Sequence, residues 1–228
     1  MSLFELKKED RRFFIKFFGI KMNFVLPVGG NNKIILVKKD WTEKCIKSVK
    51  GVKVKFHGSN ATFKVYEPIP HFKKCKFTFA DDSLISIKSS TDDIKNLTVM
   101  TEAKGSQLII GEEFGINSGY FLFHKKENNK IEIGDDCMFS KGITIRTCDG
   151  HRIKSLETGE TINEDKDIKI GNHVWLGQEV TVLKGSEIPN NTIVAYKSIV
   201  TRKFTEENTI LAGSAAKIVK TKVNWERK

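Results

Sequence analysis

The chain has 228 residues, and 39% of them are hydrophobic, which is enough for a continuous core and argues against disorder over most of its length. The formal net charge is +11. Basic residues nevertheless occur along the whole chain without an RNP, zinc-finger or helix-turn-helix pattern, so no nucleic-acid partner is expected. No stretch approaches the roughly 20 apolar residues of a transmembrane helix, and we expect a cytoplasmic protein.

The four cysteines form no recognisable framework. Cys45, Cys75, Cys137 and Cys148 have no CxxC spacing. They are therefore expected to be buried or incidental thiols in a reducing compartment. We predict neither a disulfide framework nor a metal site.

Residues 1–28 are predicted to form an N-terminal amphipathic helix and a connector. Apolar residues share one face at spacings of three, four and seven, and most basic residues lie off that face. The apolar set is Leu3, Leu6, Phe13, Phe14, Phe17 and Phe18. Such a helix packs on its own domain or on an oligomer partner, and its basic face would also allow peripheral contact with the inner face of an anionic membrane. Arg11 and Arg12 resemble a twin-arginine export signal, but no small-residue cleavage site follows.

Residues 29–228 are predicted to form one β-rich domain with a C-terminal tail. Short strands alternate with polar turns, first over 33–38, 52–56 and 84–88. This section resembles the irregular first coils of a solenoid, and a six-residue apolar spacing becomes visible after it. Its first members are Ile110, Ile116, Leu122, Ile133, Phe139 and Ile145.

The six-residue spacing is regular from Ile170 onward. A helix needs apolar residues at spacings of three and four, and a half-buried strand needs them at every second place, so neither explains a period of six. The period predicts a prism-shaped β-solenoid with one inward aliphatic residue on each short face and a small residue at each corner. The aliphatic positions are Ile170, Leu176, Val182, Ile188, Val194 and Val200, and the accompanying positions are Val174, Val180, Ser186, Thr192 and Ser198.

Two breaks in the spacing predict loops that leave the coil. The first covers residues 124–130 and the second covers residues 147–167. Binding groups commonly sit on long loops that a rigid scaffold supports. We therefore expect a functional site at these two loops.

The second loop and the coils after it resemble the left-handed β-helix acyltransferases, specifically the sugar O-acetyltransferases related to the galactoside and maltose acetyltransferases. The resemblance runs from about Ile131 to Trp225. It implies an all-β, left-handed parallel β-helix that forms a homotrimer with active sites between subunits. The motifs that carry it are Thr147-Cys148-Asp149-Gly150-His151, Ile168 to Gly177, Ser198 to Arg202 and Ala212 to Val219.

The same resemblance implies that His151 is the general base of an acetyltransferase. A sugar hydroxyl must lose its proton as it attacks the thioester of acetyl-CoA, and imidazole titrates near neutral pH. Asp149 is expected to orient the imidazole or to hold the acceptor. Direct transfer between two bound substrates requires no cysteine nucleophile.

Acetyl-CoA is expected to lie along the last coils, with its phosphates near basic side chains, because this is what the resemblance implies. The candidate donor-binding residues are Trp175, Gly177, Gln178, Tyr196, Thr201, Arg202, Lys217 and Lys220.

Three further residues are candidates to bind the acceptor. They are Asn163, His173 and His124, and a structural role is the other interpretation of His173. The β-helix carbonic anhydrases bind zinc through histidines that include a pair five residues apart. This chain has no such pair, so no metal is expected.

We therefore predict an acetyl-CoA-dependent O-acetyltransferase that modifies a hydroxyl of a sugar or of a cell-surface glycan. Two alternatives remain open. An N-acetyltransferase of a nucleotide-linked amino sugar would use His151 equally well, because an amine acceptor must also be deprotonated. The other alternative is a solenoid without catalytic activity that acts as a scaffold or binds an anionic surface.

Overall fold

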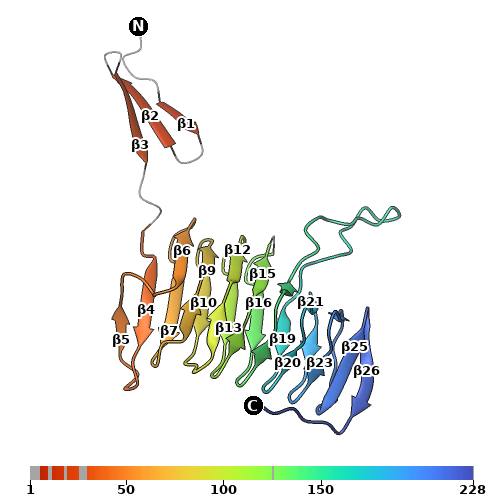
Figure 1. Cartoon of the computed structure of the whole chain (residues 1–228). Helices are drawn as coiled ribbons and strands as arrows, with labels where there is room; N and C mark the ends of the chain where they lie inside the picture. Colours follow the sequence, from red (N-terminus) through yellow and green to blue (C-terminus); the bar gives the residue numbers. More distant parts are fainter. Residues whose placement is uncertain (1–5, 10–11, 18–19, 26–29, 125, 228) are drawn as a thin grey trace.

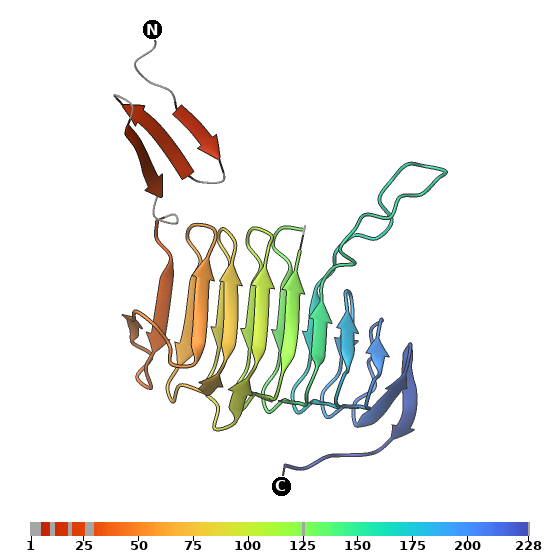
Figure 2. The ribbon, with the colours of Figure 1, turned by 45° about the horizontal axis from the view of Figure 1, so that its top comes forward.

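The computed structural model describes residues 6–9, 12–17, 20–25, 30–124 and 126–227. From Lys33 onward the chain winds into a β-helix with three sheets, which we call face one, face two and face three (Figure 1). Each regular coil contributes one strand to face one, then one to face two and one to face three. Figure 2 shows successive coils stacked along one axis.

The strands within each face are parallel, except at the ends of faces one and two. Face one consists of β5 (Glu43–Cys45), β4 (Lys33–Val37), β7 (Thr62–Tyr66), β10 (Leu84–Ile87), β13 (Gln107–Ile110), β16 (Lys130–Ile133), β19 (Ile168–Ile170) and β22 (Glu187–Ile188). Face two consists of β8 (His71–Lys73), β11 (Asp93–Lys95), β14 (Gly115–Ile116), β17 (Met138–Phe139), β20 (Trp175–Leu176), β23 (Ile193–Val194), β25 (Thr209–Gly213) and β26 (Ala216–Thr221). Face three consists of β6 (Val52–Phe56), β9 (Cys75–Phe79), β12 (Leu97–Thr101), β15 (Gly119–Phe123), β18 (Ile143–Arg146), β21 (Thr181–Leu183) and β24 (Ile199–Val200).

The six-residue spacing corresponds to one inward aliphatic side chain on each face, as predicted. Every aliphatic member from Ile170 to Val200 is at most 2% exposed. The accompanying residues from Val174 to Ser198 are buried as well. Ser186 shows why a small polar residue fits such a position: its hydroxyl donates a hydrogen bond to the carbonyl of Val200 in the next coil, at 3.0 Å. The sequence therefore predicted the core of the last coils correctly.

The first coils have a wider core built from aromatic side chains. Phe63, Phe77 and Phe79 are fully buried, and the ring centroids of Phe63 and Phe77 are 5.2 Å apart in an edge-to-face arrangement. These larger side chains fill coils whose strands are up to five residues long, compared with two or three residues in the last coils. The longer strands explain why the six-residue spacing is not regular in the first half of the sequence.

The N-terminal segment forms strands, so the predicted amphipathic helix is wrong. β1 (Leu6–Glu9), β2 (Arg12–Phe17) and β3 (Ile20–Val25) form an antiparallel three-stranded sheet that shares no strand with the β-helix. Leu3 and Phe18 of the predicted helical face lie outside the described residues. The basis for a membrane-binding helix in residues 1–28 is thereby lost.

The physical reason is that the residues of β2 and β3 satisfy a strand pattern as well as a helical one. Phe13 is in register with Phe24, and Ile15 is in register with Met22. Aromatic and β-branched residues favour strands, and paired apolar residues on neighbouring strands stabilise a sheet. Within the described residues, no helix is long and apolar enough to cross a bilayer.

Candidate active site

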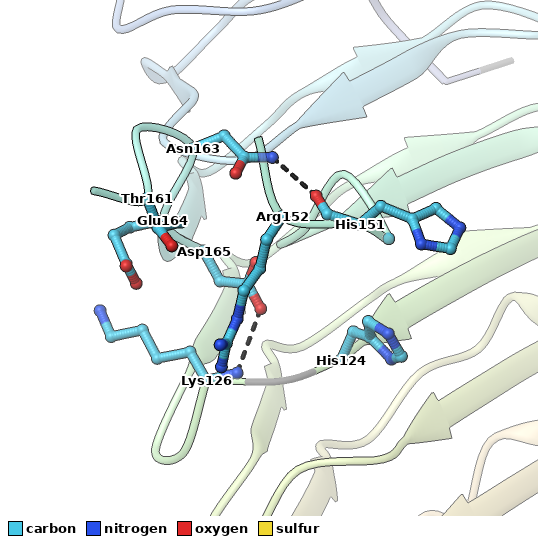
Figure 3. Close-up of a pocket in the computed structure, with 9 residues that line it drawn as sticks. His124, Lys126, His151, Arg152, Thr161, Asn163, Glu164 and Asp165 are labelled. Carbon is cyan, nitrogen blue, oxygen red and sulfur yellow. Dashed lines mark hydrogen bonds between the residues drawn. The ribbon is translucent and has the colours of Figure 1, made fainter. Parts of the chain in front are cut away.

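A pocket of about 320 Å³ lies where the two predicted loops meet (Figure 3). Both loops leave the β-helix between face three and face one, the first after β15 and the second after β18. The backbone N–H of Lys126 in the first loop donates to the carboxylate of Asp165 in the second, at 3.1 Å. The pocket therefore combines groups from two neighbouring coils, and its lining includes His124, Lys126, His151, Arg152, Asn163 and Asp165.

His151 is placed by a tight turn at the start of the second loop. Gly150 before it has a φ of 90°, a conformation that side-chain-bearing residues rarely adopt. The glycine thus lets the chain turn away from β18 and present His151 at the pocket.

The imidazole of His151 is exposed and, among the described residues, receives no hydrogen bond. Figure 3 shows the rings of His151 and His124 on one side of the pocket, with Glu164 on the opposite side. A ring with free nitrogens is available to accept a proton from a bound molecule. The structure therefore brings together three predicted site residues, namely His151, His124 and Asn163.

Asn163 holds the two halves of the second loop together. Its Nδ2 donates to the carbonyl of His151 and to the carboxylate of Asp149, both at 2.8 Å. Its Oδ1 accepts from the backbone N–H of Ile153 at 2.7 Å. The amide of Asn163 is therefore engaged with the loop itself, although the residue also lines the pocket.

Asp149 binds a lysine rather than the ring of His151. Its carboxylate accepts from Nζ of Lys184 at 2.6 Å, and the same ammonium group donates to the carbonyl of Asn163 at 2.7 Å. The hydrogen bond from Lys184 holds the pKa of Asp149 below its usual value, even though partial burial acts in the opposite direction. Asp149 thus attaches the loop to the residue after β21, and within the described residues it has no hydrogen bond to the imidazole of His151.

His124 is oriented by the coil before it. Its Nδ1 forms a hydrogen bond with the carboxylate of Glu102, and its side chain is partly exposed. This contact leaves Nε2 directed away from Glu102, because the two ring nitrogens lie on different edges of the imidazole. His124 can therefore contact a ligand in the pocket while its orientation stays fixed.

His173 lies at a different corner of the β-helix, between face one and face two. Its ring stacks on Trp225 with centroids 4.2 Å apart, Nδ1 contacts the Asp136 carboxylate at 2.5 Å, and Nε2 lies 2.9 Å from the Trp225 carbonyl. Burial favours a lower pKa for His173, but the hydrogen bonds to Asp136 and to the Trp225 carbonyl outweigh it and raise the pKa above its usual value. His173 therefore holds the C-terminal tail, and the structure does not bring it to the pocket of His151.

The predicted donor-binding residues are distributed over face two and two corners of the last coils. Trp175 begins β20 on face two and is 37% exposed. Gly177 and Gln178 lie between faces two and three, and Tyr196 lies at the same corner one coil later. Thr201 and Arg202 follow β24, at the corner that also carries the second loop.

Lys217 and Lys220 lie on β26, the last strand of face two, and both are exposed. Lys220 is in register with Ile210, which continues through Ile193 to Trp175. A single row of side chains on face two therefore links the indole to the terminal lysines. By contrast, His151 projects from the corner between faces three and one of the same chain, away from Trp175 on face two.

Sequence reasoning did not identify Lys184, Glu102 or Arg152. Lys184 is 35 residues from Asp149, and only the packing of successive coils makes them neighbours. Glu102 meets His124 in the same way, from one coil earlier. Arg152 follows His151 directly, and its place in the pocket was the only one of the three that the sequence could have indicated. Among the residues that the structure describes, no group of three or more His, Cys, Asp or Glu side chains is arranged to hold a metal ion.

No protein-family model matches the chain. Among curated proteins, the polysialic acid O-acetyltransferase of Neisseria meningitidis is 54% identical to it over 138 residues. The match covers 60% of this chain and 63% of that protein, so this chain spans less than two thirds of the relative's length.

Two solved structures resemble the chain over most of its length. The polysialic acid specific acetyltransferase NeuO has a TM-score of 0.70 and 26% sequence identity, over 88% of this chain and 87% of that one. The polysialic acid O-acetyltransferase OatWY has a TM-score of 0.58 and 30% identity, over 88% of this chain and 90% of that one. The likeness therefore extends well beyond the part of the sequence that carries the six-residue spacing.

Proposed function

Because this chain belongs to the hexapeptide-repeat acyltransferases that include the sugar O-acetyltransferases, we propose that it transfers an acetyl group from acetyl-CoA to a hydroxyl of a sialic-acid-containing glycan. The coils are then left-handed, as in that family. The observation that carries the proposal is the free imidazole of His151, held by Gly150 and Asn163 in a pocket between two loops. The 54% identity to a polysialic acid O-acetyltransferase supports the acceptor class.

In the proposed reaction His151 acts as the general base. One of its ring nitrogens takes the proton of the sugar hydroxyl while the hydroxyl oxygen forms a bond to the thioester carbonyl carbon. The carbon–sulfur bond then breaks, and the CoA thiolate leaves with the proton that the imidazolium returns. The products are the acetyl ester and CoA thiol, so proton and acyl group are both accounted for.

A covalent acyl-cysteine intermediate has little support. Cys148 is the cysteine nearest to His151 in the sequence, and it is 2% exposed. Burial raises the pKa of its thiol, and the thiolate is the reactive form of cysteine. Direct transfer between two bound substrates therefore fits the site better than a ping-pong sequence.

The cationic side chains of the pocket suit an acceptor that carries a carboxylate. Lys126 and Arg152 both line it, and both side-chain types pair well with carboxylate oxygens. Thr161 and Glu164 also line the pocket, and their oxygen atoms can bind sugar hydroxyls. Although Glu164 and Asp165 balance the charge of the lining, the pocket offers partners for both the carboxylate and the hydroxyls of an acidic sugar.

We further propose a homotrimer in which the donor site is completed between subunits. The row from Trp175 to Lys220 lies on face two, whereas His151 projects from the corner between faces three and one. Lys217 and Lys220 form no ion pair with a described residue and suit the CoA phosphates. Sedimentation should give three times the 25.9 kDa of one chain; a stable monomer at assay concentration would contradict the shared site.

The acceptor is tested by a panel that contains polysialic acid, neutral oligosaccharides and a nucleotide-linked amino sugar. Release of CoA thiol is followed with each compound, and the product is identified by mass and by sensitivity to mild alkali, which removes an O-acetyl ester but not an N-acetyl amide. We expect alkali-labile acetylation of polysialic acid. An alkali-stable product on the amino sugar would make the chain an N-acetyltransferase, and absence of turnover with every compound would exclude the proposed activity.

A further inference from the structure

The positive charge of this chain is concentrated at one end of the β-helix. Residues 30–80 contain 12 lysines and three acidic residues, which accounts for a net +9 of the chain's +11. Residues 81–228 contain 21 basic and 22 acidic residues and are therefore close to neutral. Residues 1–29 add six basic and three acidic residues, a net +3, so within the β-helix only the first coils have many more lysines than carboxylates.

Several of these lysines lie together on face three. Lys53 on β6 and Lys76 on β9 are directly opposite one another in the register, and Lys55 follows on β6. Lys74 lies just before β9. A groove of about 700 Å³ is lined by Lys53, Lys74 and Lys76 together with the polar side chains of Asn96 and Thr98. We call this the lysine groove.

The lysines of this groove lack the partners that other sheet lysines have. On face two, Lys73 and Lys95 both pair with Asp93, at 3.1 and 2.9 Å. Among the described residues, no carboxylate pairs with Lys53, Lys74 or Lys76. Like charges opposite one another on neighbouring strands destabilise a sheet. The repulsion between Lys53 and Lys76 therefore lowers the stability of the folded chain, and an anion bound between them would reduce that repulsion.

A row of hydrogen-bonding side chains connects the groove with the coil of the active site. In register along face three stand Lys53, Lys76, Thr98, Tyr120 and Thr144. Thr144 lies on β18, the strand that leads into the loop of His151. In Figures 1 and 2 the same strands follow one another from the first coils to the point where that loop projects.

The distance along this row suits an extended polymer. Neighbouring strands are about 4.8 Å apart, so the two lysine-bearing strands lie about 14 and 19 Å from β18 along the axis. A single sugar cannot contact both ends of such a row, whereas several linked sugars can. Threonine and tyrosine hydroxyls between the ends provide donors and acceptors for sugar hydroxyls.

We propose that the lysine groove binds carboxylates of an extended anionic glycan and holds the polymer along face three while one of its sugars occupies the pocket of His151. This inference rests on the proposed function, and it adds a second contact that short acceptors cannot make. A glycan is favoured over single-stranded nucleic acid because no lining residue of the groove is aromatic, and proteins that bind single strands rely on stacked aromatic side chains.

The kinetic test uses the double variant Lys53→Gln/Lys76→Gln, with Lys44→Gln/Lys47→Gln as the matched control. Lys44 and Lys47 belong to the same basic segment and are exposed, but they do not line the groove. We expect the KM for long polysialic acid to rise by about tenfold in the groove variant, as the loss of two ion pairs would give. The kcat, and the kinetics with a sialic acid trimer, should not change. An unchanged KM for the long polymer, or an equal rise in the control, would overturn the proposal.

A binding measurement separates this inference from the proposed function. Long polysialic acid is titrated into the catalytically disabled His151→Ala variant at low and at high salt. Binding that is weakened by salt and lost in the triple variant with Lys53→Gln/Lys76→Gln supports the groove, even if no acetyl transfer is found. Equal competition by single-stranded DNA or by anionic phosphatidylserine vesicles would show a nonspecific polyanion site and would overturn the glycan assignment.

Discussion

At the scale of single residues, the second loop is held by contacts that converge behind His151. Asn163 joins Asp149 to the backbone of His151, and Lys184 joins Asp149 to the coil. The side chain of His151, the proposed general base, takes part in none of these contacts. Its position is thus determined by neighbours, while its ring stays free to exchange a proton.

This arrangement predicts a coupled effect of Asp149 and Lys184 on turnover. Asp149→Asn and Lys184→Met should each lower kcat by about ten- to a hundredfold, because small displacements of a catalytic group are costly. The double variant should lose no more than the worse single variant, since the two side chains form one contact. Additive losses would contradict this, and Glu157→Gln in the same loop is the control.

The stabilising contribution of the contact between Asp149 and Lys184 depends on pH in a predictable direction. The pKa of Asp149 is lowered in the folded chain, so its stabilising contribution is present above the usual value of 3.8 and is lost as the pH falls through the lower folded value. The titration of Asp149 should therefore be absent from the rate profile between about pH 5 and 9. An inflection that disappears in Asp149→Asn would contradict the assignment.

His173 predicts a different response in the C-terminal tail. Its raised pKa means that the protonated ring stabilises the fold fully below 6.5, its usual value, and that this contribution is lost as the pH rises through the folded pKa. The melting temperature should therefore fall as the pH rises from about 6 to about 8. His173→Asn suits the left-handed backbone at this corner, where φ is 53°, and should abolish that slope. An equal slope in both proteins would contradict the role of His173.

The predicted site residues that the structure brings together are those whose position depends on local chain order. His151, His124 and Asn163 meet because both loops leave the same corner of neighbouring coils. The partner of Asp149 was not predictable, because Lys184 comes from another coil. His173 illustrates the same limit, since its contacts with the tail join residues 52 positions apart.

At the scale of elements, the six-residue spacing predicts individual inward residues only in those coils where the spacing is regular. The last regular coils have short strands of two or three residues, so their inward residues were predicted position by position. The first coils have longer strands and phenylalanine side chains, and there only the strand character was predictable. Residues 12–17 satisfied two patterns at once, and the helical interpretation of them was wrong.

The core of the last coils predicts a large loss of stability when an inward residue is shortened. Leu176 is fully buried, so Leu176→Ala should lower the free energy of unfolding by about 2–5 kcal/mol through lost burial and the cavity it leaves. Thr181 points outward on the next face. Thr181→Ala should therefore change the free energy of unfolding by less than about 1 kcal/mol. Chemical denaturation of both variants tests the difference. A loss of similar size in each would contradict the assigned inward and outward positions.

At the scale of the whole molecule, charge and shape divide the β-helix along its axis. The first coils carry the net positive charge, the middle coils carry the two loops, and the last coils carry Trp175 and the terminal lysines. Lysines occur throughout the chain, but residues 30–80 are both richer in lysine and poorer in carboxylates than residues 81–228. In the proposed trimer, an acceptor that arrives from the basic end of one subunit and a donor bound on the last coils of a neighbouring subunit would meet at the loop of His151.

The most direct test of this account is the rate of acetyl transfer from acetyl-CoA to polysialic acid by the wild-type protein, His151→Ala and His71→Ala, with the acetylated product measured by mass. His71 is an exposed histidine that pairs with Asp93 in an early coil, so it controls for the substitution itself. We predict a loss of at least about a hundredfold in His151→Ala, as expected for removal of a general base, and an unchanged rate in His71→Ala. A wild-type rate in His151→Ala, or a wild-type protein that leaves the glycan unmodified, would contradict the account.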